Sequence, residues 1–201
     1  MKLLLTSAGF ENPKVGQEFL KLVGKPAEKI KVVFIPTAST SEEELSYVSK
    51  SKDELACFGV RLKNIVELNI DHKIYYSALK DFDVMYMCGG NTFHLLSQIK
   101  KFDFEKVIKM FIKSNRVYVG VSAGSLLMGP NIELAKFGDK KVGRLKDFTG
   151  LEYIDEAIAP HVTDEDIFQV KAFQKKVNYK IIPLNDSQAV VVIDGKQKIV
   201  G

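Results

Sequence analysis

A serine stands between two glycines in the segment Gly120-Val-Ser-Ala-Gly124, directly after an apolar run. The pattern G-x-S-x-G at the junction of a strand and a helix is typical of a nucleophile elbow. Such a turn is so tight that side chains at the two glycine positions would collide with neighbouring segments. The segment predicts that Ser122 is a nucleophile and that the amide of Ala123 helps to stabilise an oxyanion. The alternative is a plain tight turn with a capping serine.

A second glycine motif, Gly89-Gly90-Asn91-Thr92, follows the apolar run Asp83–Met87. Two glycines before a capping residue leave backbone N–H groups free to bind an anion. Beside an elbow on a neighbouring strand, Gly89, Gly90 and Asn91 are expected to form the second half of an oxyanion hole. One alternative is a turn that only needs a positive φ. Another is a nucleotide- or flavin-binding loop, which the absence of G-x-G-x-x-G and P-loop lysine motifs disfavours.

The chain holds three histidines, one of which is well placed to act as a base. His161 follows the apolar run 157–160 and is expected at the carboxyl end of a strand, the sheet edge where Ser122 also lies. His72 lies in a polar stretch that indicates a solvated loop, and His94 follows the glycine motif in the first turn of a helix. We therefore predict His161 as the general base.

The residues alone leave open which acid orients His161. A histidine base needs a carboxylate that fixes its tautomer and stabilises the imidazolium. In α/β hydrolases the acid lies between the serine and the histidine in the sequence. The carboxylates in that interval are Glu133, Asp139, Asp147, Glu152, Asp155 and Glu156.

Short apolar runs alternate with amphipathic ones along the chain, which predicts an α/β fold: a mostly parallel sheet with helices on both faces. Residues 1–201 are expected to form one domain. The expected strands are Lys2–Thr6, Lys31–Pro36, Leu62–Leu68, Asp83–Met87 and Arg116–Val121. At the end of the chain, Ala189–Ile193 and Gln197–Val200 flank Asp194-Gly195, which predicts an antiparallel hairpin.

Helical patterns fill the intervals between these strands. We expect helices over Val15–Val23 and Phe104–Lys113, and a helix that begins with a capping box in Thr40-Ser41-Glu42-Glu43 and runs toward Cys57. The region Gly129–Tyr153 has four glycines and no clear period. An irregular segment of that length is often functional.

The composition excludes several classes of protein. The net charge of +4 comes from lysines interleaved with acids, so no basic surface for nucleic acid is expected. No apolar stretch is long enough for a membrane span or a signal peptide, and the two cysteines lie far apart, as in a cytoplasmic protein. Without H-E-x-x-H, paired cysteines or further histidines, no metal site is expected.

Three motifs together resemble one family. Gly-Gly-Asn-Thr-Phe at 89–93, Ser-Ala-Gly-Ser at 122–125 and Pro160-His161 resemble peptidase E, the aspartyl dipeptidases, of which the cyanophycinases are relatives. The resemblance covers nearly the whole chain. It implies a class I glutamine-amidotransferase-like (flavodoxin-like) sheet, a Ser-His-acid triad and hydrolysis of short peptides without a cofactor. A non-peptide esterase or amidase of the same fold is the alternative, and a monomer or homodimer is expected.

The same resemblance narrows the choice of the acid. It places the base at His161 and the acid in the loop after the elbow helix, which leaves Asp139 and Glu133. Asp139 fits the family's spacing to the histidine better, so it is the predicted acid. Glu133 is the reserve, or a group that binds the amino end of the substrate.

One segment departs from the family. Aspartate-selective members carry basic residues shortly after the histidine, whereas here the segment Asp164-Glu165-Asp166 is acidic. An acidic rim repels an aspartyl side chain, so a preference for an N-terminal aspartate is not expected; the alternative is that the rim binds a free amino terminus. Arg144 is the arginine placed to compensate.

Overall fold

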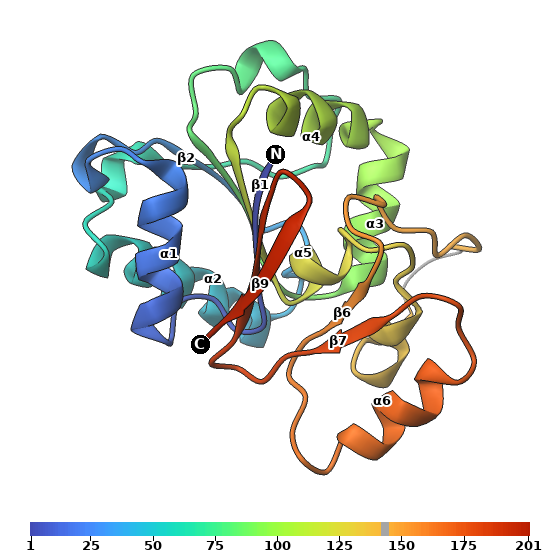
Figure 1. Ribbon diagram of the computed structural model, residues 1–201. Helices are drawn as coiled ribbons and strands as arrows, with labels where there is room; N and C mark the ends of the chain where they lie inside the picture. Colours follow the sequence, from blue (N-terminus) through green and yellow to red (C-terminus); the bar gives the residue numbers. More distant parts are fainter. Residues whose placement is uncertain (142–144) are drawn as a thin grey trace.

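The computed structural model describes residues 1–141 and 145–201 of the chain (Figure 1). Arg144, the arginine expected to offset the acidic segment, lies outside the described residues. None of the helices in the described ranges is long and apolar enough to cross a membrane.

Within the described residues, seven strands form a central sheet in the order β3-β2-β4-β5-β1-β8-β9. Neighbouring strands from β3 to β1 are parallel, and β8 and β9 are antiparallel to their neighbours. The strands are β1 (Lys2–Thr6), β2 (Val32–Ile35), β3 (Ile65–Glu67), β4 (Val84–Met87), β5 (Val117–Val121), β8 (Ala189–Ile193) and β9 (Lys196–Val200). The predicted α/β class with an antiparallel C-terminal hairpin is confirmed.

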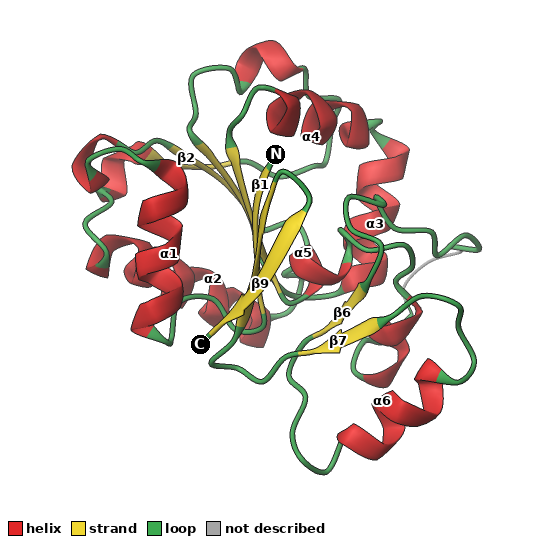
Figure 2. Cartoon of the chain, in the orientation of Figure 1, coloured by secondary structure: helices red, strands yellow, loops and turns green. Residues whose placement is uncertain are grey.

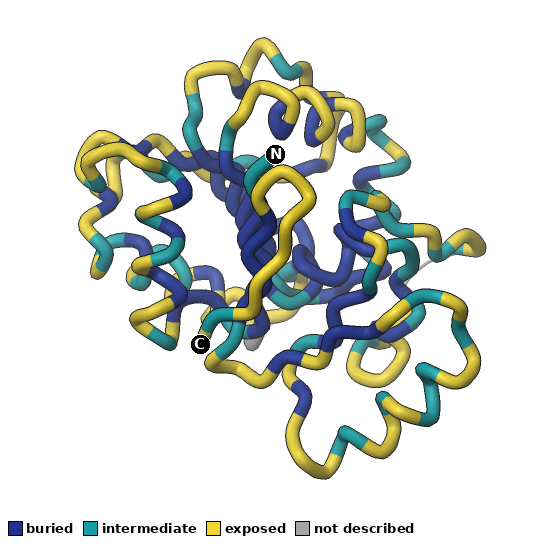
Figure 3. The backbone as a smooth tube through the Cα atoms, viewed as in Figure 1, coloured by how far each residue is buried: buried dark blue, intermediate teal, exposed yellow. Residues whose placement is uncertain are grey.

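Helices cover both faces of this sheet (Figure 1). The helices α1 (Pro13–Val23) and α2 (Glu42–Cys57) pack on one face. The other face carries α3 (Thr92–Lys101), α4 (Phe104–Lys113) and α5 (Ala123–Leu126). Strands β2, β4 and β5 are buried along their whole length, because side chains of alternating residues enter the two cores (Figure 3).

The carboxyl ends of three adjacent strands bring separate motifs together. Strand β5 lies between β4 and β1, and its register pairs Val121 with Thr6 and Gly120 with Met87. The residues that follow these strands therefore meet at one edge of the sheet: Gly89 after β4, Ser122 after β5 and Ser7 after β1. This edge is where open α/β sheets place their sites.

A second, two-stranded sheet stands apart from the central one (Figure 2). It pairs β6 (Ala157–Ala159) with β7 (Ile181–Pro183) in parallel, and α6 (Ile167–Gln174) connects them. The expectation that His161 ends a strand of the main sheet is therefore wrong. Strand β6 instead packs on α5. Because of this packing, His161 still lies at the carboxyl edge of the large sheet, beside Ser122.

Two expected boundaries also shift. The capping box at the start of α2 begins at Ser41, one residue later than expected, since the Ser41 hydroxyl accepts from the Glu44 amide. In the expected strand at 62–68, residues Leu62–Asn64 form a 3₁₀ turn and only Ile65–Glu67 pair with β2. The described part of the irregular region contains a 3₁₀ turn over Glu133–Phe137.

Candidate active site

Ser122 sits on a strained turn between β5 and α5. Its backbone angles are φ 48° and ψ −106°, which a residue with a side chain rarely adopts. The N–H of Ser122 donates to the carbonyl oxygen of Thr6 at 3.0 Å. The buried hydroxyl of Ser125 lies 2.7 and 2.8 Å from the carbonyl oxygens of Thr6 and Gly120, which share its one proton. The turn is thus held to β1 at two points, which fixes the position of the Ser122 side chain.

The two glycines around Ser122 are required by close packing. A Cβ at Gly120 would lie 2.5 Å from the carbonyl oxygen of Gly124. A Cβ at Gly124 would lie 2.4 Å from the carbonyl oxygen of Met87. Both distances are far below van der Waals contact, so the steric reason given for the G-x-S-x-G pattern holds in the structure.

His161 lies beside Ser122. Its Nε2 is 2.9 Å from Ser122 Oγ, within hydrogen-bond distance. His161 also has a positive φ of 58°, and its N–H donates to Ser7 Oγ at 2.7 Å. The structure therefore brings together the serine and the histidine that the sequence singled out.

Asp186 occupies the position expected of Asp139. Its Oδ1 lies 2.6 Å from Nδ1 of His161, the ring nitrogen that does not face Ser122. The prediction of Asp139 as the partner of His161 is wrong, because its carboxylate accepts instead from the Thr92 N–H at 2.7 Å. These contacting residues follow one another along the chain as Ser122, His161 and Asp186, so Asp186 lies outside the interval between the serine and the histidine in which the acid was expected.

Asp186 lies on a tight turn between β7 and β8. The Gln188 N–H donates to the Asn185 carbonyl oxygen at 3.0 Å, and the Asn185 side chain accepts from the N–H and hydroxyl of Ser187. The Ser7 hydroxyl donates to Asp186 Oδ1 at 2.9 Å. The run Asn-Asp-Ser before the last hairpin is a turn signal in the sequence. Ser7 follows β1 without such a signal. It contacts Asp186 and His161 because the register of β1 and β5 places the end of β1 beside Ser122.

The segment around Asp139 is bound to the start of α3. Asp139 accepts from the Thr92 amide there, and the Asn91 side chain donates to the Lys140 carbonyl oxygen at 2.8 Å. The Asn91 side chain also accepts from the His94 N–H at 2.9 Å, so Asn91 is the N-cap of α3. Asn91 was expected to contribute to an oxyanion hole, but its N–H donates to the Ala38 carbonyl oxygen and its side chain binds the loop and the helix. Asp139 does border both cavities beside Ser122.

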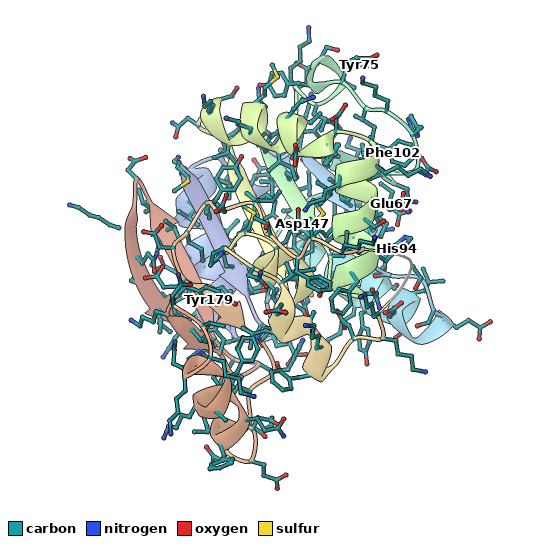
Figure 4. All side chains as sticks on the ribbon, turned by 90° about the vertical axis from the view of Figure 1, so that its right-hand side faces the viewer. Glu67, Tyr75, His94, Phe102, Asp147 and Tyr179 are labelled. Atoms are coloured by element: carbon teal, nitrogen blue, oxygen red, sulfur yellow. The ribbon has the colours of Figure 1, made fainter. Side chains whose placement is uncertain are left out.

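The other expected residues lie away from Ser122. Glu133 pairs with Lys136 at 2.6 Å and lines neither cavity beside the serine. His94, labelled on α3 in Figure 4, is half-buried and also lines neither cavity. His72 is exposed and lies beside Asp71. Asp147, labelled in Figure 4, pairs with Lys100, and this ion pair holds the pKa of Asp147 well below its usual value.

Several backbone amides around Ser122 are available to a ligand. The N–H groups of Gly89, Gly90 and Ala123 donate to no other residue that the structure describes. A Cβ at Gly89 would lie 3.2 Å from Cβ of Ser122, so the glycine loop passes directly beside the serine. Gly90 has a φ of 125° and a Cβ there would lie 2.4 Å from the Ala38 carbonyl oxygen, so both the turn and the packing require glycine.

Two cavities meet at Ser122 and His161. The smaller, of about 210 Å³, lies between α5, the 3₁₀ turn at 133–137 and α6. The larger, of about 410 Å³, extends past Gly89 to α2. In the larger cavity burial raises the pKa of the Glu54 carboxyl and of the Cys88 thiol. No three His, Cys, Asp or Glu side chains of the described ranges form a group that could hold a metal ion.

Known proteins resemble this chain in both sequence and fold. The profile of peptidase family S51 matches residues 3–200. An uncharacterized peptidase of Listeria innocua, Lin0382, is 33% identical over 171 residues, which cover 81% of this chain and 80% of that protein. Another, PM1590 of Pasteurella multocida, is 29% identical over 96% of this chain and 94% of its own length.

Proteins with more specific names match as well. Peptidase E of Shewanella amazonensis is 33% identical over 66% of this chain and 54% of its own length. The crystal structure of a candidate peptidase E protein from Listeria monocytogenes matches with a TM-score of 0.84 at 29% identity, covering 99% of this chain and 97% of that one. The chain therefore belongs to peptidase family S51 and is a peptidase of the peptidase E kind.

Proposed function

We propose that this peptidase is a serine-type enzyme that hydrolyses short peptides, dipeptides among them, through an acyl-enzyme on Ser122. The proposal rests on two hydrogen-bond contacts of His161: its Nδ1 lies 2.6 Å from Asp186 Oδ1, and its Nε2 lies 2.9 Å from Ser122 Oγ. Nucleophile, base and orienting acid stand in the relationship that serine hydrolases of unrelated folds share.

The first half of the reaction acylates the serine. Ser122 Oγ attacks the carbonyl carbon of the scissile peptide bond while Nε2 of His161 takes the hydroxyl proton. Asp186 accepts a hydrogen bond from Nδ1–H, which keeps Nε2 free to act as the base and stabilises the imidazolium. The imidazolium then gives its proton to the leaving amine as the C–N bond breaks. An ester between Ser122 and the acyl part of the substrate remains.

The second half returns the enzyme to its resting state. A water molecule gives a proton to His161 and attacks the ester carbonyl, and the protonated histidine returns that proton to Ser122 Oγ as the ester bond breaks. In both halves the negative oxygen of the tetrahedral intermediate binds to the amides beside the serine. The free N–H groups of Gly90 and Ala123 support this role, with Gly89 shaping the approach.

The cavities support a short substrate. Each opens on Ser122 from a different direction, so one can take the residue before the scissile bond and the other the residue after it. Their volumes, about 210 and 410 Å³, suit single residues rather than a long chain.

Hydrolysis of a dipeptide library tests the proposal. The purified protein is incubated with dipeptides of mixed side chains, and released amino acids are measured beside the Ser122→Ala variant. We expect cleavage by the wild type and a loss of several orders of magnitude in the variant, because a nucleophile has been removed. Equal cleavage by both proteins, after removal of contaminating peptidase, would show that Ser122 is not the nucleophile.

We also propose that the enzyme works in the cytoplasm as a monomer or a homodimer, without a cofactor. Cys57 and Cys88 are both free thiols in the structure, as is usual in a reducing compartment. Fractionation of the source cells and light scattering of the purified protein test this. Recovery in a secreted fraction, or a mass above that of a dimer, would contradict it.

A further inference from the structure

The larger cavity beside Ser122 carries an excess of negative charge. Its lining contains the carboxylates Glu11, Glu44, Glu54, Asp139 and Asp186, with Lys50 as its lysine. Five carboxylates against one lysine give a formal charge of −4 with His161 neutral, whereas the whole chain carries +4. Low-dielectric walls around a cleft focus such a field on whatever enters it.

Most of these carboxylates already have strong partners. Glu11 pairs with Lys50, Asp186 contacts His161, and Glu44 accepts from the amides of Thr40 and Ser41. Glu54 and Asp139 each accept from one backbone amide, of Phe10 and Thr92 respectively, and neither forms an ion pair with a residue in the described ranges. Asp139 borders both cavities, whereas Glu54 belongs to the larger one alone.

Glu54 is a carboxylate of the larger cavity that forms no ion pair with the residues the structure describes. It is half-buried on α2, and burial raises its pKa although Lys50 acts in the opposite direction. The charged form of a half-buried carboxylate is destabilised by the loss of water around it. A cation bound beside the carboxylate stabilises that charged form again. Such groups in clefts are often binding groups.

The smaller cavity is more apolar, although its lining also includes two carboxylates. Most of its lining is apolar: Leu126, Leu134, Ala135, Phe137, Ala159, Pro160, Val162 and Val170. Asp166, its second carboxylate beside Asp139, accepts from the N–H and hydroxyl of Thr163. An apolar side chain therefore suits this cavity better than a charged one.

We propose, resting on the peptidase function proposed above, that the enzyme selects peptides in which a lysine or arginine residue stands across the scissile bond from an apolar residue. The basic side chain enters the larger cavity, and its cation binds beside Glu54. The cavity extends past Gly89 to α2, where Glu54 lies. A free α-amino group stays next to the scissile carbonyl, so a long basic side chain suits this part of the cavity better.

Paired dipeptides test this preference. Lysine and leucine are joined in both orders, and each dipeptide is compared with its norleucine analogue, which keeps the length of the lysine side chain without its charge. We expect kcat/KM for one lysine order to exceed that of its analogue at least about tenfold, the scale of one charge-assisted hydrogen bond. Equal rates for lysine and norleucine, or faster cleavage of an aspartyl dipeptide, would overturn the proposal.

A matched pair of variants assigns the preference to Glu54. Glu54→Gln keeps an acceptor for the Phe10 amide and removes the charge, so the lysine preference should disappear, mainly through a higher KM. Glu28→Gln makes the same change at an exposed position outside both cavities and should behave as the wild type. An unchanged preference in Glu54→Gln excludes Glu54 as the selecting group.

Binding to an inactive variant separates this proposal from the peptidase mechanism. Calorimetry of Ser122→Ala with the same dipeptides needs no turnover. Tighter binding of the lysine dipeptide than of its norleucine analogue supports the charged cavity even if Ser122 proves not to be the nucleophile. Equal binding contradicts it even if the wild type cleaves peptides. Acetylation of the α-amine shows which amine binds in the larger cavity. If the acetylated lysine dipeptide still binds more tightly than its norleucine analogue, the cavity binds the side chain. If acetylation abolishes binding, the cavity binds the α-amine and the proposal fails.

Discussion

Asp186 lies 2.6 Å from Nδ1 of His161, on the side of the ring that does not face Ser122. The carboxylate comes from the turn between β7 and β8, beyond the histidine in the chain. A hydrogen bond in this position fixes the proton on Nδ1 and leaves Nε2 to contact Ser122 Oγ at 2.9 Å.

The first prediction concerns this contact. Asp186→Asn should lower kcat by about four orders of magnitude with little change in KM, because an amide favours the wrong imidazole tautomer. Steady-state kinetics on any cleaved dipeptide measure the change.

Asp139→Asn is the matched control. Asparagine still accepts from the Thr92 amide, so the loop should hold and kcat should stay within about tenfold of the wild type. KM is expected to rise, since Asp139 borders both cavities. A severe loss of kcat in Asp139→Asn with a mild one in Asp186→Asn would reverse the assignment.

The second prediction concerns Ser7, which contacts both His161 and Asp186. Its hydroxyl accepts from the His161 N–H at 2.7 Å and donates to Asp186 at 2.9 Å. Ser7→Ala should lower kcat about tenfold through the loss of these two hydrogen bonds. Ser187→Ala, which removes a hydroxyl from the same turn as Asp186 without touching His161, should have little effect. Equal kinetics in the two variants would exclude a positioning role for Ser7.

Some parts of the site could be predicted because their signals are local. The elbow around Ser122 is a short pattern between a strand and a helix, and its glycines are required by contacts within that pattern and with the neighbouring strand. His161 was found because the chain has only three histidines. The parallel strands were clear from continuous apolar runs such as Val32–Ile35, which are buried on both faces.

Other parts depend on packing between distant segments. Asp186 reaches His161 only because β6 and β7 pair as a separate sheet and bring the turn at 185–188 to the end of β1. The separation of that sheet has no local signature. The residues Asn185-Asp186-Ser187 do indicate a turn, but not that the turn lies beside His161. The capping box is a smaller example, since Thr40 and Ser41 are both good N-caps and the local pattern alone does not decide which of them caps α2.

The third prediction contrasts two adjacent glycines. Gly89→Ala places a Cβ 3.2 Å from Cβ of Ser122 at a residue whose φ is not positive, so it should lower kcat with little loss of stability. Gly90→Ala requires a φ of 125° and places a Cβ 2.4 Å from a carbonyl oxygen. It should lower the free energy of unfolding by about 1–3 kcal/mol or more. Thermal melts and kinetics of both variants check this, and an equally large loss of Tm in both would contradict it.

The fourth prediction concerns pH and Glu54. Burial raises the pKa of its carboxyl in the folded protein, so its contribution to stability is fully present below about pH 4.5 and is lost as the pH rises through the raised value. Glu54→Gln should therefore have a higher Tm than the wild type at pH 7, and the difference should shrink toward pH 4. Glu28→Gln should show no such trend. A lower Tm for Glu54→Gln at pH 7 would mean that the carboxylate stabilises the fold.

The central claim is that His161 and Asp186 activate Ser122 as a nucleophile, and labelling by a fluorophosphonate tests it most directly. The adduct is located by mass spectrometry of proteolytic peptides in the wild type and in His161→Ala and Asp186→Asn. We predict a single adduct on Ser122 in the wild type, formed far more slowly in both variants although they remain folded. An unlabelled Ser122 in active wild type, or equal labelling rates in all three proteins, would contradict the mechanism.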